Sequence, residues 1–376
     1  MFTKSRFSRN MDERKEMEKG KLQQTPIKLL IVDDSPLFRQ MINVILQKYP
    51  HLAVAGLVEN GEKAMRLVVE KKPDVILLDL EMPHIDGFTF LRWLMAYYPT
   101  SVLVVSARSD GYTVFRALEL GACDFYGKPE PNGTLLEQPE ALISKIETLS
   151  KIPKESLSKK YSKLTRSKKR VEVSLQPPKQ REGLSRLLAI GASTGGPPAL
   201  VEIISNLSED LPIPVVISQH MPPGFTKSFA ERLNKLSRLQ VSEVGGGEPL
   251  EAGRVYIAPG GYHLLFEKIG SRIHTCLKAK GETDRYAPSV DLMMISAAEF
   301  FKDGVYGVVL TGMGDDGKIG LKKVKETGGI TLAESEETAV VFGMPREAIQ
   351  AGVVDQVLPL HKIAAEITRH YRRFPK

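Results

Sequence analysis

Short apolar runs alternate with amphipathic stretches through two long segments of this chain, residues 27–146 and 187–376. The apolar runs have the length of buried strands, and the stretches between them have the residue spacing of surface helices. Strands that are joined through helices pair in parallel, and the helices cover both faces of the sheet. The alternation therefore predicts an α/β protein with two doubly wound domains.

The expected strands follow from the apolar runs. They are residues 29–32, 53–58, 75–78, 102–105 and 124–126 in the first domain, and 187–190, 214–218, 255–258, 307–310 and 353–358 in the second. In a parallel sheet, the residues that follow the strands collect at one edge, the carboxyl edge. We expect the functional groups of both domains at that edge.

Positive charge lies mostly outside the two domains. The formal net charge is +7, yet residues 1–28 hold 8 Lys and Arg against 4 Asp and Glu, and residues 145–186 hold 13 against 4. The domains are therefore net acidic, and the basic parts are an N-terminal extension (1–26) and a linker (147–186). We expect a solvated spacer there, although such a segment could also contact DNA, RNA or anionic lipid.

The composition is typical of a cytoplasmic protein. Two cysteines are too few for a disulfide framework, and no apolar run is long enough to span a membrane. The N-terminus is rich in charged residues and lacks the apolar core of a signal peptide.

A glycine-rich turn at residues 191–196 separates the first expected strand of the second domain from a helical pattern. Its Ser193 fits G-x-S-x-G, in which glycines expose a serine hydroxyl close to backbone N–H groups, as a nucleophile requires. A phosphate loop would need Lys-Ser or Lys-Thr where this chain has two prolines. The turn alone leaves open a nucleophile, a structural glycine turn and an anion site.

Two histidines could act as the base for this serine. His220 ends the second expected strand of this domain, and His263 comes shortly after the third. A further glycine-rich turn carries Asp315 and Asp316, one of which could orient the histidine and stabilise its imidazolium form. The glycines of that turn leave backbone N–H groups open for an oxyanion, and an acidic helix N-terminus is the alternative interpretation.

Polar side chains also follow the strands of the first domain, namely Asp33, Asp34, Asp79, Ser106 and Lys128. Three carboxylates that converge at one edge repel one another unless a hard cation such as Mg2+ neutralises them. A carboxylate there could attack a phosphoryl group while the cation and the lysine absorb the developing charge. The first acidic pair alone would also fit the N-terminal cap of a helix.

On these residues, the segment 27–146 resembles the receiver domain of response regulators, a flavodoxin-like fold with five parallel strands. The resemblance implies that Asp79 accepts the phosphoryl group. It also implies that Asp34, Asp79 and the backbone carbonyl of Glu81 hold Mg2+. The other pocket residues would assist the transfer: Asp33 as a further carboxylate, Ser106 as the switch hydroxyl and Lys128 as the charge-stabilising lysine.

The second domain resembles the catalytic domain of the chemotaxis protein-glutamate methylesterases, the CheB family. The segments that carry the resemblance are residues 191–196, 219–226, 258–260, 289–291, 310–317 and 343–348. The resemblance implies that Ser193 is the nucleophile, His220 the general base and then acid, and Asp316 the orienting carboxylate. It implies the backbone N–H of Met313 as the oxyanion donor. The basic extension and the long basic linker depart from the family pattern.

Together the two resemblances imply a phosphorylation-activated esterase of bacterial chemotaxis. It would hydrolyse glutamate γ-methyl esters on chemoreceptors, release methanol, and could deamidate receptor glutamines. The expected partners are methyl-accepting chemoreceptors and the chemotaxis histidine kinase, with no nucleic acid and with membrane contact only through receptors. Mg2+ would serve receiver phosphorylation, and ester hydrolysis would need no cofactor.

Two other classes of protein remain as alternatives. A DNA-binding response regulator would use the basic linker to contact phosphates, but its output domain would normally be a small helical module. A pseudo-esterase would keep the fold as an interaction scaffold, which the intact serine, histidine and aspartate set disfavours.

Overall fold

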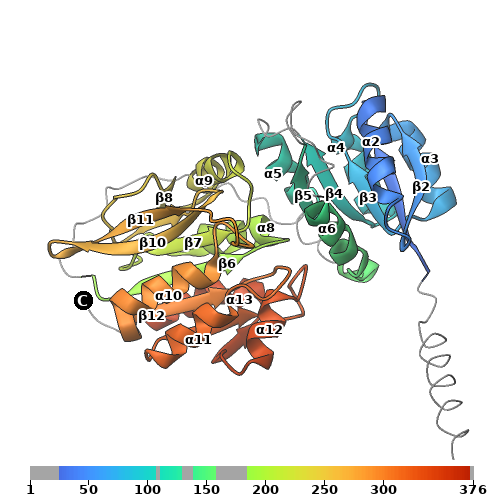
Figure 1. Ribbon diagram of the computed structural model, residues 1–376. Coiled ribbons are helices and arrows are strands. Elements are labelled where there is room, and N and C mark those ends of the chain that lie inside the picture. Colours follow the sequence, from blue (N-terminus) through green and yellow to red (C-terminus); the bar gives the residue numbers. More distant parts are fainter. Residues whose placement is uncertain (1–24, 107–110, 129–138, 158–183, 373–376) are drawn as a thin grey trace, which may run out of the picture.

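The apolar runs of each domain pair into one parallel sheet, so the predicted α/β class with two doubly wound domains is confirmed (Figure 1). The computed structural model describes residues 25–106, 111–128, 139–157 and 184–372. The N-terminal extension up to residue 24 and linker residues 158–183 lie outside these described residues.

The first domain has the strand order β2-β1-β3-β4-β5, with every pair parallel. This is the expected flavodoxin-like order, with a switch point beside β1 and β3. The elements are β1 (Ile27–Val32), α2 (Pro36–Leu46), β2 (Leu52–Val58), α3 (Gly61–Lys71), β3 (Val75–Leu78), α4 (Gly87–Tyr97), β4 (Ser101–Ser106), α5 (Gly111–Glu119), β5 (Asp124–Gly127) and α6 (Glu140–Ser150).

Helix α6 continues past residue 146, where the sequence predicts the linker to begin. Its buried face includes Leu142, Ile146 and Leu149, which join one apolar cluster with the strands of the sheet. Leu157 is buried in the same cluster. The apolar spacing of this stretch therefore belongs to the first domain rather than to a spacer.

The second domain has a seven-stranded parallel sheet in the order β14-β13-β12-β6-β7-β9-β8. A separate antiparallel pair, β10-β11, lies beside it. The elements are β6 (Leu187–Ala192), α8 (Gly196–Asn206), β7 (Val215–Gln219), α9 (Phe225–Leu236), β8 (Gln240–Glu243), β9 (Arg254–Ile257), β10 (Tyr262–Ile269), β11 (Arg272–Ala279), α10 (Val290–Phe301), the 3-10 turn η1 (Lys302–Gly304), β12 (Val305–Val309), α11 (Lys318–Glu326), β13 (Ile330–Glu334), α12 (Met344–Gln350), β14 (Gln356–Leu358) and α13 (Leu360–Arg372).

The sequence predicted five of these strands and missed β8, β13 and the β10-β11 hairpin. The hairpin turns at Gly270, which has a left-handed φ of 61°, and only part of each strand is buried. Its apolar residues are therefore too scattered to stand out as a run, although a two-residue glycine turn is a known hairpin signal.

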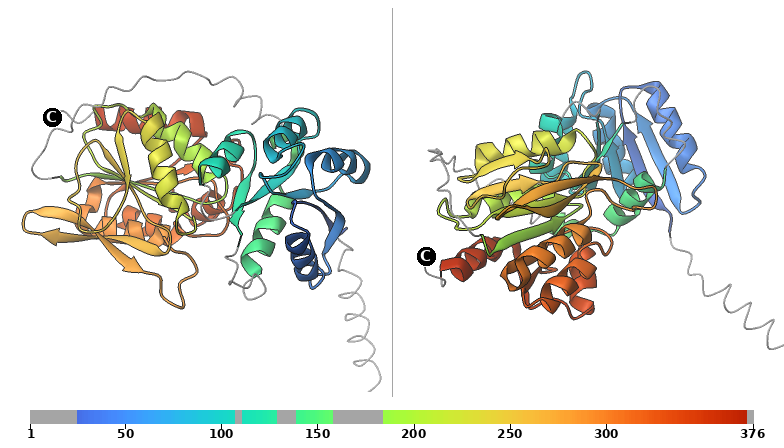
Figure 2. Two further views of the ribbon diagram at one scale, coloured as in Figure 1. Left: turned by 90° about the horizontal axis from the view of Figure 1, so that it is seen from above. Right: turned by 60° about the vertical axis from the view of Figure 1, so that its left-hand side comes forward.

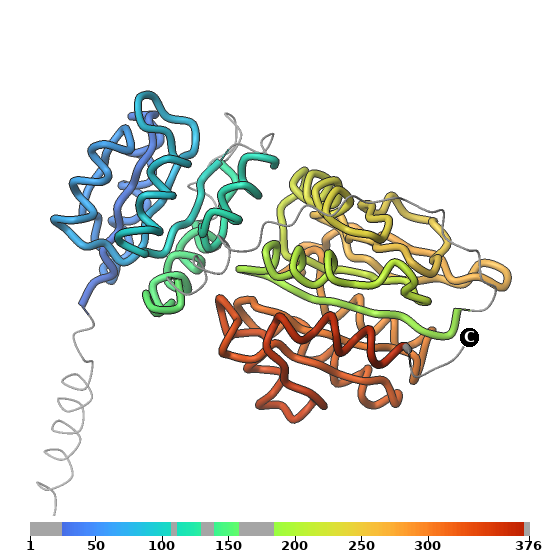
Figure 3. The backbone as a smooth tube through the Cα atoms, turned by 180° about the vertical axis from the view of Figure 1, so that it is seen from behind, coloured from blue at the N-terminus to red at the C-terminus, as the bar shows by residue number. Residues whose placement is uncertain are grey.

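The two domains lie side by side, with α5 of the first facing α8 and α9 of the second (Figures 2 and 3). Two aromatic pairs pack between them, Phe115 with Phe229 at 5.2 Å between ring centroids and Phe125 with Phe225 at 4.7 Å. Among the described residues, no helix is both long enough and apolar enough to cross a membrane.

Candidate functional site

The nucleophile candidate sits where β6 ends. The Ser193 N–H donates to the Thr311 carbonyl at 3.0 Å, and the Gly196 N–H donates to the Ser193 carbonyl at 2.8 Å. Gly195 has a left-handed φ of 79°, and a Cβ at Gly312 would lie 2.8 Å from the Ser193 Cβ. Two strand-end turns therefore approach so closely that only glycines fit, and they hold Ser193 at the carboxyl edge.

Ser193, His220 and Asp316 form one hydrogen-bonded line. His220 follows β7, the strand next to β6, and its Nδ1 lies 3.2 Å from Ser193 Oγ. Its Nε2 lies 2.7 Å from Asp316 Oδ2, and Asp316 precedes α11. The geometry is that of a nucleophile, a base and a carboxylate that orients the base.

Asp316 is buried but well supplied with donors. It accepts hydrogen bonds from the backbone N–H groups of Val290 and Asp291, both at 2.8 Å, and from the Ser289 hydroxyl at 3.1 Å. Burial raises the pKa of Asp316, but the bond to His220, its positive charge and the two N–H groups outweigh that effect. The net pKa lies below the ordinary aspartate value, so Asp316 is a carboxylate that can stabilise an imidazolium.

The alternative base and the alternative orienting carboxylate, His263 and Asp315, have other partners. His263 is fully buried, lies 2.8 Å from Asp284 through Nε2 and accepts the Ser289 N–H at Nδ1. Asp315 is half exposed and pairs with Lys318 at 3.3 Å. Of the two histidines and two aspartates left open by the sequence, the structure brings His220 and Asp316 to Ser193.

Two supporting features of this site were not predicted from the sequence. The Gln219 side-chain amide donates to the carbonyls of both Ser193 and His220, at 2.9 and 3.1 Å. The Asp291 carboxylate accepts hydrogen bonds from the N–H groups of Gly317 and Gly320. It therefore caps the N-terminus of α11, the helix that follows Asp316. Burial and the neighbouring Asp316 charge raise the Asp291 pKa to about 6. Gln219 and Asp291 both lie in segments that carry the family resemblance, which was the sequence signal for them.

Met313 lies between Gly312 and Gly314 in the turn beside Ser193. Gly314 has a left-handed φ of 88°, a backbone conformation that favours glycine in this turn. The Met313 side chain contacts the first domain, where the Ser144 hydroxyl lies 3.4 Å from its sulfur and Thr148 lies alongside.

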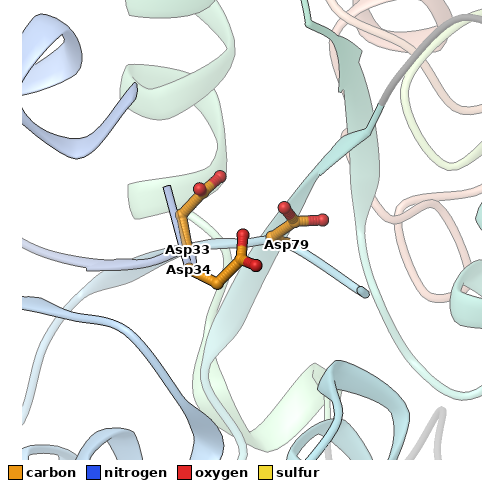
Figure 4. Close-up of side chains that lie close together, drawn as sticks. All are labelled: Asp33, Asp34 and Asp79. Atoms are coloured by element: carbon orange, nitrogen blue, oxygen red, sulfur yellow. The ribbon is translucent and has the colours of Figure 1, made fainter. Parts of the chain in front are cut away.

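Three carboxylates of the first domain lie close together and form an acidic pocket (Figure 4). One oxygen each of Asp33, Asp34 and Asp79 lies within 4.8 Å of the others. The Lys128 ammonium lies 2.8 Å from Asp33 and also pairs with Asp79. The donor set is all hard oxygen, which suits Mg2+.

Burial raises the pKa of Asp33, and the nearby Asp79 charge adds to this, although Lys128 opposes both effects. Burial lowers the pKa of Lys128, but its two carboxylate partners outweigh this and raise it overall. One lysine therefore does not neutralise this pocket, and a cation would relieve the repulsion.

Ser106 and Glu81 lie beside this pocket. Ser106 is buried at the end of β4, and its carbonyl accepts the Lys128 N–H at 2.7 Å. The Glu81 side chain is exposed, and the Glu81 N–H donates to Asp79 at 3.3 Å. All the predicted pocket residues therefore gather at the carboxyl edge of the first sheet.

The carboxyl edge of the second sheet meets the first domain through a buried polar contact that the sequence did not reveal. Thr194, the neighbour of the candidate nucleophile, donates through its hydroxyl to Asp124 of β5 at 2.5 Å. Asp124 also pairs with Lys145 of α6. Arg232 of α9 pairs with Glu119 of α5 at the rim of the same interface.

Comparison with known proteins finds two families in this chain. The family model for CheB methylesterase matches residues 188–367, and that for the response regulator receiver domain matches residues 29–139. A protein-glutamate methylesterase/protein-glutamine glutaminase from Geobacter sulfurreducens is 44% identical over 91% of this chain and 96% of its own length. One from Pyrococcus abyssi is 39% identical over 91% of this chain and 93% of its own length.

A crystal structure of the Thermotoga maritima CheB methylesterase catalytic domain is 45% identical and covers 49% of this chain and 98% of its own, with a TM-score of 0.48. Both family models match, and the sequence similarity to curated relatives extends over nearly their full length. This chain therefore belongs to the family of CheB protein-glutamate methylesterases that carry a receiver domain.

Proposed function

We propose that this protein is a phosphorylation-activated serine esterase that hydrolyses glutamate γ-methyl esters on chemoreceptors. The observation that carries the proposal is the hydrogen-bonded line of Ser193, His220 and Asp316 at the carboxyl edge of the methylesterase domain. The names of the relatives, protein-glutamate methylesterase/protein-glutamine glutaminase, support the substrate class.

The reaction begins at the Ser193 hydroxyl. Its proton passes to His220 Nδ1, 3.2 Å away, as Oγ attacks the γ-carbonyl carbon of the ester. His220 keeps its other proton on Nε2, which donates a hydrogen bond to the Asp316 carboxylate, and the negative charge of Asp316 stabilises the imidazolium. The imidazolium then protonates the departing methoxide, so methanol leaves and an acyl-enzyme remains.

Water completes the cycle. His220 takes a proton from the water as it attacks the acyl carbon, and returns that proton to Ser193 when glutamate is released. The backbone N–H of Met313 would bind the oxyanion of both tetrahedral intermediates. A receptor glutamine would react in the same way with ammonia as the leaving group, and no cofactor takes part.

The receiver domain would control access to this site. The bond from Thr194 to Asp124 and the contact of Met313 with Ser144 hold receiver residues against the turns beside Ser193. A receptor segment that approached Ser193 would compete with these contacts. The docked arrangement is therefore the inhibited state in this proposal, and an undocked state is the active one.

Phosphorylation of Asp79 would favour the undocked state. Asp34, Asp79 and the Glu81 carbonyl would hold Mg2+, which supplies charge neutralisation for the transferring phosphoryl oxygens when bound. The expected phosphodonor is the chemotaxis histidine kinase. An Asp79 oxygen would attack the donor phosphorus and form a P–O bond while the bond from phosphorus to the leaving group breaks, which releases the kinase histidine or, with acetyl phosphate, acetate. Lys128, which follows the same strand that carries Asp124, would then pair with the phosphoryl group, and Ser106 would turn toward it.

The test is methanol release from methyl-labelled chemoreceptor membranes, with and without acetyl phosphate and Mg2+. We expect release that rises with the phosphodonor in the native protein and basal release without a rise in Asp79→Asn. Ser193→Ala should release no methanol but should still be phosphorylated. Full turnover by Ser193→Ala would refute the nucleophile, and equal activation of Asp79→Asn would refute the switch.

The alternatives have their own outcomes in this test. Folded protein that releases no methanol from a competent receptor under either condition would favour the pseudo-esterase scaffold. Salt-dependent binding of random DNA in place of esterase activity would favour a DNA-binding regulator.

A further inference from the structure

The loop between β11 and α10, residues 280–289, lies over the candidate base. The Tyr286 ring stacks on the imidazole of His220, with 4.2 Å between ring centroids and 10° between the ring planes. Because Nδ1 and Nε2 already face Ser193 and Asp316, the stacking partner covers a face of the imidazole that the hydrogen bonds leave open. Tyr286 is thus a direct neighbour of the proposed catalytic line.

The loop is anchored on both sides of Tyr286. Upstream, the Asp284 carboxylate lies 2.8 Å from buried His263 and accepts the Gly281 N–H at 2.7 Å. Downstream, the Ser289 hydroxyl donates to Asp316, the carboxylate that also faces His220. The position of the Tyr286 ring is therefore set by the same network that holds Asp316.

The Tyr286 ring is also confined from other directions. The Arg285 guanidinium lies 5.0 Å from its centroid and 3.7 Å from Asp315. The buried Tyr286 hydroxyl lies 2.7 Å from the position that a Cβ on Gly314 would occupy. Burial raises the pKa of Tyr286, despite the opposing Arg285 charge, so the ring is a neutral phenol.

We propose that Tyr286 is a positioning residue for His220, an inference that rests on the proposed esterase function. Two bonded ring nitrogens leave the imidazole able to tilt about the axis that joins its partners. A parallel aromatic ring at van der Waals distance opposes this tilt and excludes water from that face. Reaction rates depend steeply on such geometry, since a misplacement of about 1 Å can cost about 100-fold.

The kinetic test compares Tyr286→Phe, which keeps the ring, with Tyr286→Leu, which removes it. The assay is methanol release from methyl-labelled receptor membranes with acetyl phosphate and Mg2+ present. We expect Tyr286→Leu to lower kcat about 10- to 100-fold with little change in KM. Tyr286→Phe should keep the kcat of the native protein. Tyr262→Leu is the matched control, because Tyr262 is an exposed tyrosine of the same domain.

A second readout does not depend on turnover. With histidine-labelled full-length protein, the ring current of Tyr286 should move the His220 Cε1 proton upfield, and His220→Gln identifies that signal. Tyr286→Leu should move it downfield, whereas Tyr286→Phe should leave it in place. Each variant is checked for folding by its melting temperature.

The outcomes separate this inference from the proposed function. Loss of rate in Tyr286→Phe equal to that in Tyr286→Leu would assign the effect to the hydroxyl and overturn the stacking role. A rise in KM with kcat unchanged would make Tyr286 a substrate contact and also overturn it. An unchanged His220 signal in Tyr286→Leu would do the same. A native protein that lacks esterase activity would refute the proposed function, and the stack would still be tested by the His220 signal.

Discussion

Each of the two carboxyl edges holds a buried aspartate, and the pKa values of the two aspartates are shifted in opposite directions. In the receiver domain, burial and the nearby Asp79 raise the pKa of Asp33, with Lys128 as the opposing cation. In the methylesterase domain, Asp316 is equally buried, yet its pKa lies below the ordinary value. Both aspartates follow strands of parallel sheets, so the fold alone does not explain the difference.

The difference lies in how many donors face each carboxylate. Asp316 accepts from two backbone N–H groups at the start of α10, from a serine hydroxyl and from His220. Asp33 accepts the Ser35 N–H at 2.9 Å and shares Lys128 with a second carboxylate. A satisfied carboxylate can orient a base without metal, whereas a crowded and poorly satisfied cluster is suited to bind a cation.

The largest effect is expected from Asp316→Asn, which removes the charge of the carboxylate that accepts from several hydrogen-bond donors. An amide would favour the wrong histidine tautomer and would not stabilise the imidazolium, so kcat should fall about 10^3- to 10^4-fold. The measurement is methanol release from labelled receptors, with Asp79 phosphorylation as a check that the receiver is intact.

Asp315→Asn is the matched control, because Asp315 is half exposed and pairs with Lys318 rather than His220. We expect it to change kcat by less than about 3-fold, as for the loss of an exposed ion pair. A native kcat in Asp316→Asn would show that the donors around the site orient His220 without the carboxylate charge.

A smaller effect is expected from the binding of Mg2+ to the acidic pocket of the receiver domain. Mg2+ at about five times its dissociation constant should stabilise the receiver domain by about 1 kcal/mol, a melting shift of about 3–6 °C. Asp34→Asn should lose most of this shift, as measured by calorimetry on the full chain.

The Mg2+ effect should weaken as the pH falls. A raised pKa means that folded Asp33 binds its proton more tightly than the unfolded chain does, so this contribution to stability is present at low pH. It is lost as the pH rises through the raised pKa, where the cation can take the place of the proton. A melting shift that grows at acid pH would contradict the assignment of Asp33 to the cation pocket.

The smallest effect is expected from the contact that links the two domains at their rim. Arg232→Gln removes the pair with Glu119, which is worth about 0.2–1 kcal/mol at a partly exposed position. Basal esterase activity should therefore rise by up to about 5-fold if docking inhibits the enzyme. Lys227→Gln removes the same charge from an exposed position of the same helix and should change nothing. Equal activities of the two variants would argue against docking as the inhibited state.

Much of the fold could be predicted because strand-length apolar runs are local features. The strands before Asp33, Asp79, Ser193 and His220 all form where the runs predict them. The β10-β11 hairpin was missed because its strands are half buried, and the end of α6 was assigned to the linker although its last turn carries no basic residue. The residues of the acidic pocket were predicted because they come after the expected strands of a parallel sheet.

The choice between the competing site residues could not be made locally. His220 and His263 both follow strands, and Asp315 and Asp316 are adjacent, so spacing does not distinguish them. The family resemblance favoured His220 and Asp316, and the structure places them in line with Ser193. Their competitors form pairs with Asp284 and Lys318.

The sequence by itself determined which side chains stand at the two carboxyl edges, because strand ends can be read from apolar periodicity. Only the tertiary structure decided their electrostatic state and their neighbours. The N-terminus of α10 supplies the donors to Asp316, Tyr286 covers His220, and Asp124 reaches Thr194 across 70 residues of sequence. The contacts of Asp316 and Tyr286 join segments of the methylesterase domain that are distant along the chain, so they arise only when that domain has folded, and the contact of Thr194 with Asp124 also needs the two domains to dock.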